Sequence, residues 1–219
     1  VQVNWQKTRS PVTTEFWRSV GHSQNAFFVE SFVDEIAYKA GIDPMEFRES
    51  RLPKNSRQLK VLQKVKEMSE WAKKKGKSMG LATHFSYKSH AAAVIEVDNK
   101  DSLKVKNVWC ALDCGIALNP DGVHAQLMSS VIFGLTAALF GKIEIEDSKV
   151  IQDNFDGYPL LTLEQTPNIH TEIIKSKERP TGAGEPGVPV IAPALCNAIF
   201  KEPTKRIRPL PVSDHMDVS

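Results

Sequence analysis

Apolar residues in the first third of the chain recur at the three- and four-residue intervals of amphipathic helices. The first such stripe spans residues 27–37. A second, short helix is predicted to follow, because Asp43 can cap its start and Pro44 suits its first turn. A third is predicted over residues 58–74, with one apolar stripe and many lysines on its other faces, a pattern typical of a solvated surface. The segment 1–76 is therefore predicted to be helical.

After residue 76 the pattern changes to the alternation and short apolar runs of β-strands, with further helices between them. The predicted elements are strands over 91–97, 104–112 and 169–174, a hairpin over 142–154, and helices over 119–141 and 191–200. The helix that Asn119 and Pro120 can open is apolar enough to be largely buried. Because helices and strands follow one another without regular βαβ alternation, segment 77–219 is predicted to be mixed and the whole chain to be an α+β fold.

The composition of the 219 residues, 41% apolar and 25% charged, is that of an ordinary globular unit. A formal net charge of +2 gives no reason to expect nucleic acid as a partner. The sequence shows no uninterrupted apolar run of membrane-spanning length and no signal-peptide pattern, and it begins as if cut from something longer. The three cysteines lack Cys-x-x-Cys spacing and are interpreted as structural thiols. The six histidines lack metal-ligand spacing, so any metal is expected to be held by an organic cofactor.

One carboxylate, Glu185, stands inside a glycine-rich segment over residues 182–187. Glycines let a backbone approach a bulky ligand, and a helix N-terminus nearby offers N–H groups to anionic oxygens. The segment lacks the Gly-Lys-Ser/Thr ending of a phosphate-binding loop. Taken alone it is also typical of a rigid surface turn. If it is instead part of an active site, a carboxylate fixed there suits a general base.

A second segment, residues 16–25, gathers Arg18 and several hydrogen-bonding groups just before a predicted helix, which favours an anion or a polar cofactor. His22 is singled out among the histidines for its position beside Arg18. The segment also nearly matches the Gly-x-Ser-x-Gly elbow of serine hydrolases, with Ser23 as nucleophile. The match fails at Asn25, where the turn needs glycine, and no apolar strand precedes it. Serine hydrolysis through Ser23 is therefore ranked below both of the hypotheses described below.

The third segment runs from Asp113 to Pro120, and Gln126 follows one to two turns into the next helix. Asp113 and Asn119 can tie down the loop through hydrogen bonds from side chain to backbone. This segment by itself indicates a structured loop and not a particular chemistry.

In this order, the segments resemble the C-terminal part of the large subunits of the xanthine dehydrogenase and aldehyde oxidase family. Within the family, the resemblance is to the isoquinoline 1-oxidoreductase beta subunit and its membrane-associated aldehyde dehydrogenase relatives. It covers almost the whole chain and implies a molybdopterin-binding α+β domain. The residues that carry it are Phe16-Trp17-Arg18-Ser19-Val20-Gly21-His22-Ser23-Gln24-Asn25, Asp113-Cys114-Gly115 with Asn119-Pro120, Thr181-Gly182-Ala183-Gly184-Glu185-Pro186-Gly187, and the tail from Ile191-Ala192-Pro193-Ala194 to Arg206-Ile207-Arg208.

The resemblance implies a molybdenum-dependent oxidoreductase that hydroxylates an aldehyde or an N-heterocycle, with water as the oxygen source. Glu185 matches the family's general base by its Gly-Glu-Pro setting. Arg18, Ser19, Gln126 and Gly184 match positions that contact the cofactor. The implied cofactor is molybdenum on molybdopterin, in the cytosine dinucleotide form, and no residue of this chain is expected to bind the metal directly. Electrons are expected to leave through iron–sulfur clusters on a partner subunit.

Two departures from the family pattern support a second hypothesis. The family's Met-Gly-Gln-Gly motif is absent, and Met128-Ser129-Ser130 stand where relatives usually have an acidic residue and two glycines. These departures favour a non-catalytic assembly or scaffold chain that keeps the fold without binding cofactor. The intact Arg18 and Glu185 favour the enzyme.

Because only part of the cofactor pocket is present, the chain is expected to be inactive alone. The expected partners are the remaining molybdopterin-binding part of the large subunit, an iron–sulfur subunit and a small-molecule substrate. The sequence does not distinguish a separate subunit from a fragment. It leaves the compartment open between cytoplasm and periplasm.

Overall fold

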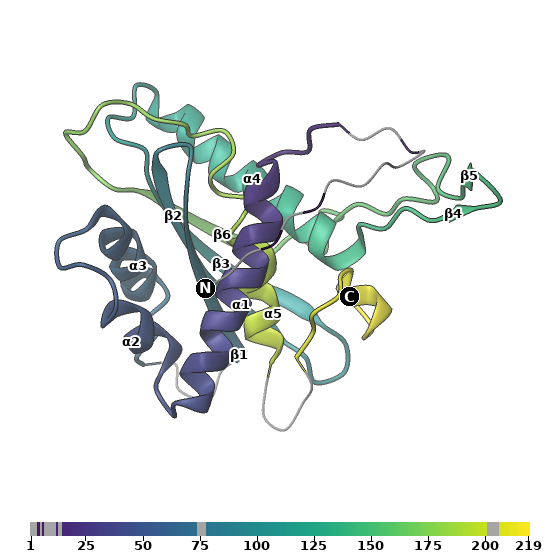
Figure 1. The fold of residues 1–219 in the computed structure, drawn as a ribbon, viewed down its shortest axis with the longest axis horizontal. Helices are drawn as coiled ribbons and strands as arrows, with labels where there is room; N and C mark the ends of the chain where they lie inside the picture. The colour runs from purple at the N-terminus through teal and green to yellow at the C-terminus, as the bar shows by residue number, and fades with distance from the viewer. Residues whose placement is uncertain (1–3, 5, 7–11, 13–14, 74–77, 201–205) are drawn as a thin grey trace.

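A computed structural model describes residues 4, 6, 12, 15–73, 78–200 and 206–219. Helices pack on both faces of a mixed four-stranded sheet, as Figure 1 shows. The predicted α+β class is confirmed. The last residue of the third predicted helix, at position 74, lies outside the described residues.

The sheet has the strand order β1-β2-β3-β6. Its first three strands form an antiparallel meander, and the fourth joins β3 in parallel. Their bounds are β1 Ser78–Ser86, β2 Ser89–Asp98, β3 Lys104–Asp113 and β6 Asn168–Ile173. The strands predicted over 91–97, 104–112 and 169–174 are therefore confirmed within two residues at each end.

One face of the sheet packs against α4 (Pro120–Phe140) and α5 (Ile191–Ile199). Side chains alternate between the two faces of a strand, so Ala82 of β1 points toward these helices. A Cβ atom on Gly80, two residues earlier, would lie 2.1 Å from the Ala198 nitrogen. The absence of a side chain at Gly80 thus allows the backbone of α5 to rest directly on β1. The first helix, α1 (Gly21–Lys39), packs in turn on α5.

The opposite face carries Leu81, Val94 and Trp109, which form a second apolar cluster with α2 (Pro44–Glu49) and α3 (Arg57–Met68). The sheet therefore lies between two helical layers.

Local signals placed several helix ends correctly. The Asp43 side chain accepts hydrogen bonds from the backbone nitrogens of Met45 and Glu46 at 2.9 and 3.1 Å, which confirms it as the cap of α2. Asn119 caps α4 through the Gly122 nitrogen at 3.0 Å. The predicted helices over 119–141 and 191–200 are confirmed with ends within one residue.

The predicted end of the third helix at residue 74 is wrong, because α3 ends at Met68. Glu70 takes up the left-handed conformation, with φ 52°, and its N–H bonds back to the Glu67 carbonyl. The N–H of Trp71 bonds to the Lys66 carbonyl at 3.1 Å, which completes a Schellman motif. The sequence analysis missed this helix end because Glu70 occupies the left-handed position, where glycine is usual.

The sequence analysis also missed β1, whose Gly80, Thr83 and His84 interrupt the apolar alternation on which strand prediction depends. The predicted hairpin over 142–154 is present, but β4 (Ile145–Glu146) and β5 (Lys149–Val150) are only two residues long. Figure 1 shows this hairpin at the end of an arm that extends away from the sheet. A short 3-10 helix, η1 (Val212–Asp214), lies near the C-terminus.

By length and hydropathy alone, α4 qualifies as a membrane-spanning helix, contrary to the expectation from the sequence. It is also less buried than predicted. One side, including Leu127, Val131 and Leu135, belongs to the core, whereas Met128 and Ile132 on the other side are 45% and 36% exposed. A single apolar helix that packs in a core passes the same test, so this helix is weak evidence for a membrane.

Candidate active site

The site begins at the turn that leads into α1. Ser19 and Val20 both have positive φ angles, 75° and 48°. This conformation is unfavourable for a β-branched residue such as Val20, and such strain is typical of functional sites. The turn is closed by a hydrogen bond from the Val20 nitrogen to the Trp17 carbonyl at 2.8 Å. It brings Arg18 and the buried Ser19 toward the loop that holds Glu185.

Arg18 links three segments that are far apart in the sequence. Its Nε donates to the Gly184 carbonyl at 2.9 Å, and its Nη2 donates to the same carbonyl. Nη2 also donates to Gln126 Oε1 at 2.9 Å and to Ser130 Oγ at 3.0 Å. Nη1 donates to Ser129 Oγ at 3.0 Å and has a second N–H with no acceptor among the described residues. The predicted site residues Arg18, Gln126 and Gly184 are therefore brought together.

Glu185 is held by Ser19 through two hydrogen bonds. The Ser19 backbone nitrogen donates to Glu185 Oε1 at 2.9 Å, and Ser19 Oγ donates to the Glu185 carbonyl at 2.9 Å. The Glu185 side chain remains partly accessible. Burial lowers the pKa of Arg18, while the nearby Glu185 carboxylate opposes that effect. The structure thus shows Ser19 as a support for Glu185, and its predicted contact with a cofactor stays a prediction.

The glycines of the loop have different surroundings. A Cβ atom on Gly187 would lie 2.8 Å from Ser130 Cβ, and one on Gly182 would lie 2.7 Å from Tyr87 Cβ. These two glycines are needed for packing inside the chain. At Gly184 an added Cβ would meet only Gln126 Oε1, at 4.0 Å. The chain itself leaves open space at that position.

The third segment contributes to the site through its loop. The Asp113 carboxylate accepts two hydrogen bonds from Arg57, at 2.7 and 2.9 Å, and one from the Gly115 nitrogen at 3.0 Å. Burial acts to raise the pKa of Asp113, but the hydrogen bonds from Arg57 and Gly115 outweigh it and hold that pKa below its usual range. Asp113 therefore fixes the loop, in agreement with its structural interpretation.

Beside this loop lies a cavity of about 350 Å³. Its walls come from the segment after Asp113, the first turns of α4 with Gln126, and the start of the glutamate loop with Thr181 and Ala183. All three sequence segments thus meet around one region: the first through Arg18, the others through the cavity walls.

The serine hydrolase hypothesis finds no support in the geometry. Ser23 lies within the first turn of α1 and not on a turn between strand and helix. Its buried Oγ makes no hydrogen bond to any described residue. His22 instead approaches His84, with 3.1 Å between Nδ1 and Nε2.

The cysteines are buried and unpaired. Burial raises the pKa of Cys110 and of Cys196 to about 12, which keeps them as thiols and agrees with their structural interpretation.

Comparison with known proteins shows the family to which the chain belongs. A sequence model described as "Molybdopterin cofactor-binding domain" matches residues 20–167. The beta subunit of isoquinoline 1-oxidoreductase from Brevundimonas diminuta is 34% identical over 212 residues, which cover 93% of this chain. The chain belongs to the molybdopterin cofactor-binding domain family. It is a relative of molybdenum hydroxylase large subunits, and the resemblance stated from the sequence is confirmed.

Other known proteins are similar to the chain in sequence or in fold. The membrane-bound aldehyde dehydrogenase (pyrroloquinoline-quinone) of Gluconacetobacter polyoxogenes is 31% identical over 219 residues, covering 89% of this chain and 28% of that protein. The aldehyde oxidoreductase from Desulfovibrio desulfuricans superposes with a TM-score of 0.76 at 13% identity, covering 91% of this chain and 41% of that one. Quinoline 2-oxidoreductase from Pseudomonas putida 86 gives a TM-score of 0.69 at 11% identity, covering 84% and 49%.

This chain spans 27% of the length of the isoquinoline 1-oxidoreductase beta subunit.

Sequence reasoning did not find two features of the site. The first is that Ser129 and Ser130, noted only as departures from the family pattern, are hydrogen-bond partners of Arg18. The second is Tyr87, which packs on Gly182 and had no sequence signal, because it lies in the turn after the missed strand β1.

Proposed function

We propose that this molybdenum hydroxylase-family chain supplies the general base and one side of the cofactor pocket of an enzyme. The enzyme hydroxylates an aldehyde or an N-heterocycle, with water as the oxygen source. The observation that carries the proposal is the placement of Glu185. Its carboxylate is held beside Arg18 and next to the open backbone face at Gly184. The relatives whose names include aldehyde dehydrogenase and isoquinoline 1-oxidoreductase support the substrate classes.

The residues of the chain have distinct parts in this proposal. When bound, the molybdenum cofactor supplies the two-electron oxidation that such a hydroxylation requires. Glu185 takes up the proton that water loses when its oxygen is transferred, because a fixed carboxylate with an accessible oxygen suits that task. Ser19 holds Glu185 Oε1 in place. Arg18 holds the Gly184 carbonyl and keeps one N–H on Nη1 for an anionic oxygen of the cofactor.

The cofactor is proposed to be molybdopterin in its cytosine dinucleotide form, with iron–sulfur clusters on a partner subunit. The residues present fit such a group on one side. Gly184 leaves open space, and Gln126 and Ala183 line the cavity of about 350 Å³ beside it. Of these residues, Gln126 and Gly184 were predicted as cofactor contacts from the sequence.

Gly184→Ala tests this fit. Because the new methyl group meets nothing closer than 4.0 Å within the chain, the fold should be unaffected. If the cofactor approaches the backbone here, molybdenum content should fall at least several-fold. The measurement is elemental analysis of the protein from its native host, together with its co-purifying chains, beside thermal unfolding of each variant. Molybdenum at the parental level in a folded Gly184→Ala protein would contradict the proposed approach.

Gly187→Ala is the matched control. Its methyl group would lie 2.8 Å from Ser130 Cβ, so it should lower the unfolding temperature. If Gly187→Ala lowers the unfolding temperature and Gly184→Ala lowers the molybdenum content without unfolding the protein, the two glycines have different roles. Gly187 then serves packing within the chain, and Gly184 serves contact with the cofactor.

One observation favours the scaffold alternative. The hydroxyls of Ser129 and Ser130 accept hydrogen bonds from Arg18 and so occupy donors that a cofactor would otherwise use. The parental protein in the elemental analysis decides between the two functions. Near-stoichiometric molybdenum supports the hydroxylase, and its absence with all partners present supports a scaffold chain.

We also propose that the remaining molybdopterin-binding part of the large subunit covers the outer face of α1. Four apolar side chains on that face are exposed: Phe28 by 65%, Val29 by 56%, Phe32 by 61% and Ile36 by 39%. Such a contiguous apolar face on one helix is typical of an interface. The chain spans only 27% of its relative, so most of a large subunit is available to cover it.

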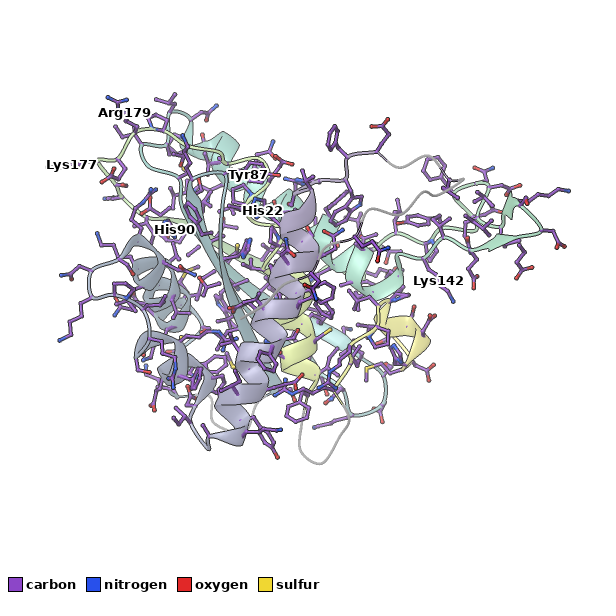
Figure 2. All side chains as sticks on the ribbon, in the orientation of Figure 1. His22, Tyr87, His90, Lys142, Lys177 and Arg179 are labelled. Atoms are coloured by element: carbon purple, nitrogen blue, oxygen red, sulfur yellow. The ribbon has the colours of Figure 1, made fainter. Side chains whose placement is uncertain are left out.

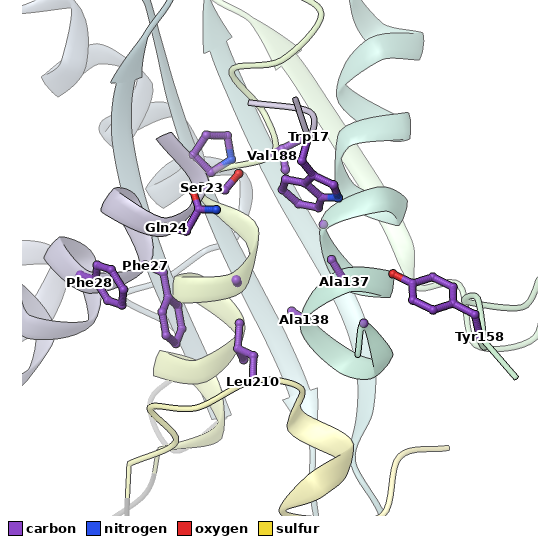
Figure 3. Close-up of a pocket in the computed structure, with 14 residues that line it drawn as sticks. Trp17, Ser23, Gln24, Phe27, Phe28, Ala137, Ala138, Tyr158, Val188 and Leu210 are labelled. Carbon is purple, nitrogen blue, oxygen red and sulfur yellow. The ribbon is translucent and has the colours of Figure 1, made fainter. Parts of the chain in front are cut away.

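A groove of about 300 Å³ continues this face between α1 and α4. Figure 3 shows Trp17, Phe27, Phe28 and Leu210 around it, with the Ser23 side chain at one end. The mainly apolar lining suits apolar side chains of the covering part.

Replacing Phe28 and Phe32 together with serine should abolish co-purification of the second molybdopterin-binding chain. Both side chains are exposed, so the unfolding free energy of the isolated chain should change by no more than about 0.5 kcal/mol per site. Pull-down from the native host measures the first effect, and urea unfolding measures the second. Phe155→Ser is the matched control, since Phe155 is 82% exposed on the distant arm. Unchanged co-purification in the double variant would exclude this face.

A further inference from the structure

Tyr87 approaches the glutamate loop from the turn between β1 and β2. Tyr87 and Lys88 form this turn with φ angles of 52° and 61°. The turn is fastened to the loop at Gly182, whose nitrogen donates to the Tyr87 carbonyl at 3.2 Å. Ser89 Oγ donates to the Gly182 carbonyl at 2.5 Å and also contacts Thr181 Oγ1 at 2.7 Å. The position of Tyr87 relative to the loop is therefore fixed by its backbone.

The Tyr87 hydroxyl is buried and has no hydrogen-bond partner of normal geometry among the described residues. A buried hydroxyl without a partner costs about 1–3 kcal/mol, so a nearby acceptor is expected to take it. Burial raises the pKa of Tyr87, and the charge of the neighbouring Glu185 carboxylate raises it further. The hydroxyl therefore keeps its proton at neutral pH and is available as a donor to Glu185.

Two histidines lie beside the Tyr87 ring, one in contact with it and the second paired with the first. The rings of His22 and Tyr87 are 5.2 Å apart, and Figure 2 shows the two residues near the start of α1. His22 Nδ1 lies 3.1 Å from His84 Nε2. Burial, with a smaller effect from His22, lowers the pKa of His84 to about 4, so His84 is neutral near pH 7. The contact with His22 restricts the Tyr87 ring, and His84 holds His22 in place.

We propose that Tyr87 is a positioning residue for Glu185, and that its hydroxyl donates a hydrogen bond to the carboxylate oxygen that Ser19 leaves free. This inference rests on the proposed function of Glu185 as the base. Ser19 N–H holds Oε1, so a second bond, to Oε2, fixes the plane of the carboxylate. Hydrogen bonds to a carboxylate favour its charged form, which is the form that accepts a proton. Among the described residues, the charged or titratable groups shown to interact with Glu185 or Tyr87 are Arg18, beside the carboxylate, and His22, which contacts the Tyr87 ring and pairs with His84.

The test is Tyr87→Phe in the assembled enzyme, with kcat/KM followed against pH. Loss of the hydrogen bond should move the acid limb of the profile to higher pH by about one unit, with a smaller loss of rate at alkaline pH. Tyr38→Phe is the control, because Tyr38 lies in the last turn of α1 against Phe200 and not at the glutamate loop. An acid limb that stays in place in Tyr87→Phe would overturn the proposal.

A second readout does not depend on turnover. The unfolding temperatures of Tyr87→Phe, Glu185→Gln and the double variant form a cycle, and a direct hydrogen bond should make the two changes non-additive. Additive changes would overturn the proposal. If Glu185→Gln retains full turnover, the proposed function fails, while a non-additive cycle would still support the hydrogen bond.

Discussion

Replacing Glu185 with glutamine is expected to lower turnover by about 10²–10⁴-fold while the molybdenum content of the assembled protein stays the same. Glutamine keeps the size of the side chain and an oxygen that can accept the Ser19 N–H. It cannot take up a proton as a carboxylate does. Turnover of an aldehyde and of an N-heterocycle, with elemental analysis of the same preparation, measures both effects.

Glu178→Gln is the matched control for this experiment, since Glu178 is an exposed glutamate in the segment leading to the same loop. It should retain parental turnover. A Glu185→Gln protein that keeps more than a tenth of parental turnover would show that Glu185 is not the base. Loss of the metal together with activity would assign it to cofactor binding instead.

The sequence predicted most of the fold because most elements are determined by short-range patterns. Asp43 and Asn119 cap their helices as expected, since a cap requires only the next two or three backbone nitrogens. The strand pattern of β2 and β3 is nearly continuous and apolar because both faces are buried, so it was visible. The errors arise where tertiary contacts overrule local preference. Gly80 in β1 is selected by the close approach of α5, which no local pattern records.

The site was predictable in its residues but not in its connections. The motif residues Arg18, Gln126 and Glu185 come together as expected for one site. The partners of Arg18 lie more than a hundred residues away along the chain, and the sequence contains no information on which acceptors its guanidinium reaches. The serines were noted only as replacements for glycines. Their geometry shows that they also bind the arginine that was expected to bind the cofactor.

A buried charge cluster beneath α1 provides the largest expected effect on stability. Arg48 Nε lies 2.9 Å from Glu30 Oε2 and its Nη1 lies 3.7 Å from Asp34 Oδ1, with 3% of the Arg48 side chain exposed. Glu30 Oε2 also accepts the Thr83 N–H at 2.9 Å, which ties α1 to β1. Arg206 Nη1 reaches Asp34 Oδ2 at 3.0 Å. Arg48 is therefore the principal counter-charge of Glu30, while Asp34 has a second one.

Arg48→Met should lower the unfolding free energy by about 3–5 kcal/mol near pH 7, because it leaves the buried Glu30 carboxylate without its cation. Urea unfolding measures the loss. The control is Arg208→Met, which removes an ion pair in which Arg208 Nη2 lies 2.7 and 2.8 Å from the two carboxylate oxygens of Glu35. The Arg208 side chain is 61% exposed, so its loss should cost no more than about 1 kcal/mol.

The loss in Arg48→Met should depend on pH in one direction. Burial already raises the pKa of Glu30 and of Asp34 in the folded state, and Arg48 opposes that rise. Removing Arg48 raises both pKa values further. A carboxyl group with a raised folded pKa favours folding most below its unfolded pKa, about 4, and loses that contribution as pH rises through the folded value. The deficit should therefore shrink as pH falls toward 4, and Glu30→Gln added to Arg48→Met should recover part of it at pH 7. A deficit independent of pH would mean that lost packing of the Arg48 stem, and not the uncompensated charge, destabilises the variant.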